Sequence, residues 1–86
     1  MKIKDGYILR VVAKQNVVLP ATGDLDLDRM LTLNGTGKFL WEHLEQGAEK
    51  EELVRAMLEH YEIREDTART CVDNFISKLM QYGFIA

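Results

Sequence analysis

The sequence predicts an α+β domain in which three antiparallel strands precede three helices, and three observations support this order. Up to about residue 33, β-branched and alternating apolar residues dominate the pattern. From residue 34 onward, the apolar residues recur at helical spacing instead. The 86 residues contain no repeat, low-complexity segment or linker, so residues 1–86 are expected to form a single domain.

The first two strands are expected to form a hairpin. The segments GYILRVVA (6–13) and NVVLP (16–20) are rich in β-branched and aromatic residues, and Lys14, Gln15 and Asn16 form a polar link between them. Pro20 should end the second strand or place it at a sheet edge, because proline has no N–H to donate.

The third strand is predicted from an alternation of period two in residues 24–33. Leucines occupy one parity and aspartates the other: Leu25, Leu27, Leu31 and Leu33 against Asp24, Asp26 and Asp28. The regular part is expected at about Arg29–Leu33, because aspartate is a poor strand former. A calcium loop would need Gly and Glu where Arg29 and Gly35 stand, so the aspartates are interpreted as a solvated edge.

Three helices should follow. Asn34 can cap the first helix, which carries Phe39, Leu40 and Leu44 on one side and stops at Gly47. The second is expected at about 49–60 and the third at about 65–82, each with an apolar face. Residue 83 is a glycine that should end the last helix, and the apolar tail behind it should fold back. This content is winged-helix-like, with the strands placed before the helices.

Charge and composition exclude several classes. The net charge of −3 and a pI near 5.3 disfavour nucleic acid as the main partner. The N-terminal stretch lacks the apolar core of a signal peptide, and no apolar run approaches the roughly 18 residues of a membrane span. A cytoplasmic protein without a membrane partner is therefore expected.

Residues that could carry chemistry are few. Gly35 and Gly37 flank a threonine at a helix start, but neither the P-loop nor the dinucleotide pattern is present, so a hinge is the expected role. The one cysteine, Cys71, has no histidine nearby in sequence, and neither His43 nor His60 belongs to a metal-binding motif. Catalysis, metal and cofactor are not expected. An enzyme using Cys71 stays as an alternative, which predicts an exposed thiol beside a histidine.

Two blocks of sequence resemble the PqqD family, named for pyrroloquinoline quinone biosynthesis protein D. The first block matches at Leu33, Asn34, Thr36, Gly37, Leu40, Trp41 and Leu44, and the second at Val72, Phe75, Ile76, Leu79, Gly83, Phe84 and Ile85. With the leading hairpin, the resemblance covers almost the whole chain. It departs from the family pattern at Gly35, where an acidic residue is common, and at Arg64, where a capping Asp or Ser is typical.

The resemblance implies a non-catalytic, winged-helix-like domain that recognises precursor peptides of ribosomally made natural products. The leader of the precursor would add as an antiparallel strand to the third strand and pack against the third helix. A peptide-modifying enzyme, often a radical SAM enzyme, would be the second partner, and pyrroloquinoline quinone is one candidate product.

The expected peptide-binding residues lie on that strand and on the outer side of the third helix. They are Arg29, Met30, Leu31, Thr32 and Leu33, then Thr67, Cys71, Asn74 and Lys78, with Tyr82 as a further candidate. Arg29 and Lys78 would pair with acidic leader residues. An exposed edge also predicts homodimers through strand pairing or segment swapping. A winged-helix DNA-binding regulator stays open as the alternative, although the third helix mixes acidic with basic residues.

Overall fold

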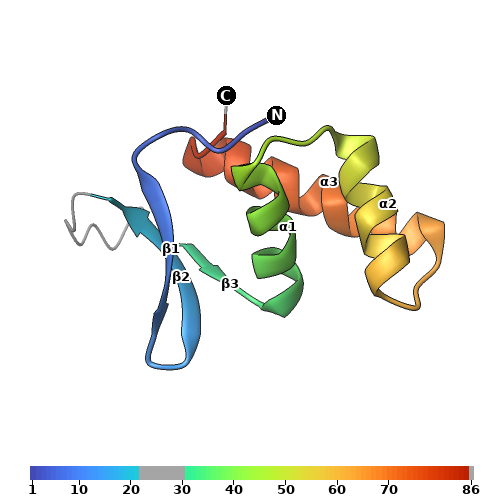
Figure 1. Ribbon diagram of the computed structural model, residues 1–86, viewed down its shortest axis with the longest axis horizontal. Coiled ribbons are helices and arrows are strands. Elements are labelled where there is room, and N and C mark those ends of the chain that lie inside the picture. The colour runs from blue at the N-terminus through green and yellow to red at the C-terminus, as the bar shows by residue number, and fades with distance from the viewer. Residues whose placement is uncertain (22–30, 86) are drawn as a thin grey trace.

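The computed structural model describes residues 1–21 and 31–85, and its element order is the predicted βββααα (Figure 1). The elements are β1 (Tyr7–Val12), β2 (Gln15–Pro20), β3 (Leu31–Leu33), α1 (Gly35–Glu45), α2 (Lys50–His60) and α3 (Glu65–Tyr82). The strands form one antiparallel sheet in the order β1-β2-β3, so β3 lies at an edge. The helices gather on one side of this sheet.

The hairpin turn lies one residue earlier than the sequence predicted. Ala13 (φ 51°) and Lys14 (φ 66°) form a two-residue loop with positive φ at both positions, while Gln15 already pairs with Val12. Such a loop follows the right-handed twist of the flanking strands. The prediction of a polar link at residues 14–16 was wrong because neither loop residue is the Asn or Gly that usually marks this turn.

The described part of β3 confirms the predicted alternation. Leu31 and Leu33 are buried and Thr32 between them is exposed. The expected strand start at Arg29 and Met30 and the acidic residues before it lie outside the described residues.

The helix ends follow the residues that predicted them. The Asn34 side chain accepts a hydrogen bond from the Gly37 N–H at 2.8 Å and caps α1. Gly83 has positive φ directly after α3, and Gly47 has positive φ one residue beyond the C-cap of α1, where a left-handed residue stops a helix. Arg64 holds the N-cap position of α3 but makes no side-chain cap there.

One core joins the sheet to the helices. The largest fully buried side chains come from β2, all three helices and the tail: Trp41, Phe84, Leu40, Leu44, Leu53, Met57, Leu79, Val18 and Val72. The tail folds back as predicted, because Ile85 forms a bridge with Ile3. Of the helices in residues 1–21 and 31–85, none has the length and apolarity that crossing a bilayer requires.

Candidate functional site

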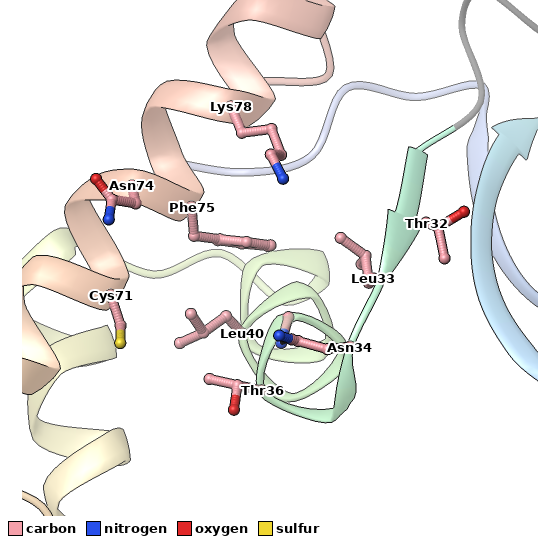
Figure 2. Close-up of a pocket in the computed structure, with 10 residues that line it drawn as sticks. Thr32, Leu33, Asn34, Thr36, Leu40, Cys71, Asn74, Phe75 and Lys78 are labelled. Atoms are coloured by element: carbon pink, nitrogen blue, oxygen red, sulfur yellow. Dashed lines mark hydrogen bonds between the residues drawn. The ribbon is translucent and has the colours of Figure 1, made fainter.

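A groove of about 300 Å³ lies between β3 and α3, and the start of α1 forms its floor (Figure 2). Its lining residues come from these three elements: Thr32, Leu33, Asn34, Thr36, Gly37, Leu40, Cys71, Asn74, Phe75 and Lys78. Five of the residues predicted for peptide binding therefore meet at one place. They are Thr32, Leu33, Cys71, Asn74 and Lys78.

The other predicted residues do not line the groove. The Leu31 side chain is buried in the core, and Thr67 is exposed on the first turn of α3. Tyr82 packs against Phe84, with ring centroids 5.4 Å apart. Arg29 and Met30 lie outside the described residues.

The hairpin loop determines which main-chain groups of the sheet face outward. A two-residue loop with positive φ at both positions makes the flanking residues, Val12 and Gln15, a hydrogen-bonded pair. In an antiparallel ladder the hydrogen-bonded pairs recur at every second residue. The odd-numbered residues of β2 therefore bond to β1, and the even-numbered ones direct their N–H and C=O groups towards β3.

The same reasoning places the main chain of Thr32 at the edge of β3 that pairs with no other strand in residues 1–21 and 31–85. Asn16 and Val18 stand opposite Leu33 and Leu31, so these two leucines form the hydrogen-bonded pairs with β2. The Asn16 side-chain amide also reaches the Leu33 carbonyl at 3.4 Å, which places that carbonyl on the β2 side. Thr32 stands between them, so its N–H and C=O point away from β2.

Side chains of β3 and α3 form the two walls of the groove above the floor that α1 provides. Leu33 points into the groove and Thr32 points away from it (Figure 2). On α3, Cys71, Asn74 and Lys78 follow one another at helical spacing and share the face towards the groove.

The residues of α1 at the floor were not predicted as binding residues. Thr36, Gly37 and Leu40 lie beneath the groove because β3 runs directly into α1. A Cβ on Gly37 would lie 3.1 Å from the Leu33 Cβ, so the glycine allows the helix to start close against the strand. The sequence had indicated a hinge at Gly37, while Thr36 and Leu40 were marked only by their place in the matched motif.

The groove carries positive charge on an acidic protein. Among the described residues that line the groove, Lys78 is the single formally charged one, whereas the whole chain has a net charge of −3. The N-terminal end of α1, which carries the positive end of the helix dipole, opens at the same place. Within the part of the chain that the structure describes, Lys78 makes no ion pair.

The arrangement around Cys71 offers little for nucleophilic chemistry. The thiol is half-buried, and no described histidine hydrogen-bonds to it. His43 and His60 both pack against the Phe39 ring, with centroid distances of 4.5 and 4.6 Å. No three potential metal ligands gather anywhere in residues 1–21 and 31–85.

Two comparisons with known proteins found similar chains. A family model described as coenzyme PQQ synthesis protein D (PqqD) matches residues 17–85. A solved structure described as TbiB1 in complex with the TbiA(beta) leader peptide is 26% identical, with a TM-score of 0.76 over 98% of this chain and 93% of that one. No curated protein matches the chain. Neither match is described as a nucleic-acid-binding protein.

Proposed function

Because the chain belongs to the PqqD family, we propose that it binds the leader of a precursor peptide and presents that precursor to a modifying enzyme. The similar TbiB1 structure, which holds a leader peptide, supports this proposal. The products of such systems are ribosomally made, modified peptides, with pyrroloquinoline quinone as one possible case.

The proposed binding mode is addition of a peptide strand to β3, and it rests on one observation. The outward N–H and C=O of Thr32 lie beside a groove with an apolar floor. A peptide strand placed there gains main-chain hydrogen bonds from the edge and buries side chains against α1 and α3. The edge supplies affinity for any sequence, and the groove supplies selectivity.

The module acts as a binding partner, not as a catalyst. Its groove holds one half-buried thiol without a histidine hydrogen bond in the described residues, and binding needs only the edge and the walls. The reaction on the peptide is then supplied by a second protein, such as a radical SAM enzyme. In the absence of peptide, the same free edge predicts weak self-pairing at high protein concentration.

A titration of the isotope-labelled protein with leader peptides encoded beside its gene tests the proposal. We expect saturable NMR shifts at residues 31–33 and along the groove face of α3. Binding should also protect Cys71, the one cysteine of the chain, from alkylation. A panel of leaders that leaves the folded protein unshifted would contradict peptide binding.

A pair of variants at Thr32 isolates strand addition. Thr32→Pro removes the outward N–H while leaving the β2 ladder intact, because proline is tolerated at a free strand edge. Thr32→Val keeps the N–H and serves as the control. One lost main-chain hydrogen bond, at about 0.5–1.5 kcal/mol, should weaken binding roughly 2- to 12-fold. Equal affinity of both variants and the parent would show that the peptide does not add at this edge.

A further inference from the structure

We infer that the groove selects peptides carrying an apolar and an acidic side chain on the same face of the bound strand, separated by an even number of positions. This inference rests on the proposed function and adds a chemical rule for the ligand. It follows from the register of β3 and from Lys78, the one charged side chain among the described residues that line the groove.

The register determines which peptide side chains enter the groove. A peptide residue hydrogen-bonded to Thr32 shares the face of the Thr32 side chain, which points away from the groove. The residues on either side of it therefore point the other way, onto Leu33, Leu40 and Phe75. Strand side chains alternate, so only every second peptide residue, about 6.8 Å apart, can contribute to selection.

The lining residues give the groove two chemically different ends. Cys71 and Thr36 lie towards one end, and Lys78 stands at the other with its amine directed into the space between α3 and β3 (Figure 2). Leu40 and Phe75 between them are buried and apolar. An apolar peptide side chain fits this middle section, and the next side chain on the same face comes within reach of Lys78.

Charge complementarity with Lys78 predicts that the second peptide side chain is acidic. In the described part of the groove Lys78 is the only charged lining residue, and its long stem allows it to follow a carboxylate while the amine stays partly hydrated. An ion pair of this exposed kind contributes modestly, so reversing its charge should weaken an acidic peptide roughly 3- to 10-fold. Screening by salt should reduce the difference.

A display library of random 12-residue peptides tests this rule without knowledge of the natural leader. Parallel selections use the parent protein, Lys78→Glu, and Lys14→Glu, which makes the same charge change at the hairpin tip. We expect the parent and Lys14→Glu to enrich acidic residues at an even spacing from an apolar residue. Lys78→Glu should enrich Lys or Arg at that same position.

The outcomes separate the rule from the proposed function. The rule alone would be overturned if the selected peptides protect Cys71 from alkylation but lack an acidic preference. Acidic residues at an odd spacing from the apolar residue, or a preference that is the same for Lys78→Glu, would overturn it as well. Failure to enrich any peptide, or enrichment of peptides that leave Cys71 unprotected, would overturn peptide binding in the groove and the rule with it.

Discussion

Replacing Asn34 with alanine tests how α1 is held at the end of β3. The Asn34 Oδ1 accepts the Gly37 N–H at 2.8 Å, and Gly37 is buried. Loss of an N-cap costs about 0.5–2 kcal/mol, and poor access of water to the freed N–H favours the upper half of that range. In a domain of this size each kcal/mol lowers Tm by about 4–8 °C, so a fall of roughly 4–16 °C is expected in thermal unfolding.

The chain offers a matched control at the start of α3. Arg64 holds the same N-cap position with extended backbone (φ −78°, ψ 155°), yet its side chain makes no cap hydrogen bond. Its contact with Asp66, at 3.6 Å, is highly exposed and should contribute little. Arg64→Ala should therefore leave Tm nearly unchanged, and Arg64→Asn should raise it. A Tm for Asn34→Ala equal to that of the parent, or equal falls for both alanine variants, would refute the capping argument.

Three further predictions concern packing, turn geometry and pH. Gly37→Ala should destabilise the fold by about 1 kcal/mol in urea unfolding, because the cost of overpacking against Leu33 exceeds the gain in helix propensity. Gly35→Ala is the control and should not destabilise the fold, since an added Cβ there meets nothing within 4 Å. Replacing Ala13 and Lys14 by Asn-Gly should stabilise the hairpin by about 0.5–1.5 kcal/mol, because both residues have positive φ; an unchanged unfolding midpoint would contradict this. Hydrogen bonding to Arg69 of α3 lowers the pKa of Glu51 below its ordinary value of 4.5. The contribution of this ion pair to folding stability is therefore present above pH 4.5 and is lost as the pH falls through the folded-state pKa. The stability difference between the parent and Glu51→Gln should accordingly shrink on acidification, and a difference that is constant from pH 7 to pH 3 would rule out this linkage.

Much of the fold was predictable because local patterns and tertiary packing agree. The change from period two to helical spacing at Asn34 coincides with the start of α1, and the predicted bounds of α3 are those observed. The hairpin loop was missed by one residue because its conformation is imposed by strand twist on residues that do not favour it. A sequence pattern carries no record of that imposed geometry.

The groove was predictable only in part. The family resemblance implied a site between the third strand and the third helix, from which Cys71, Asn74 and Lys78 were expected on one face of α3, and the structure brings this face opposite β3. Thr67 continues the same stripe but lies beyond the end of the groove, which periodicity cannot reveal. The floor formed by the start of α1 was missed because it depends on the sharp chain reversal after β3, a tertiary feature.

The close contact between Gly37 and Leu33 has a consequence for the thermodynamics of recognition. Together with the Asn34 cap, it joins β3 to α1, so residues 31–37 form one pre-organised unit before any peptide binds. The entropy lost on association then falls mainly on the peptide, which changes from a flexible chain to a strand. Stiffening the peptide, for instance by cyclisation in an extended form, should therefore improve affinity more than stiffening the protein.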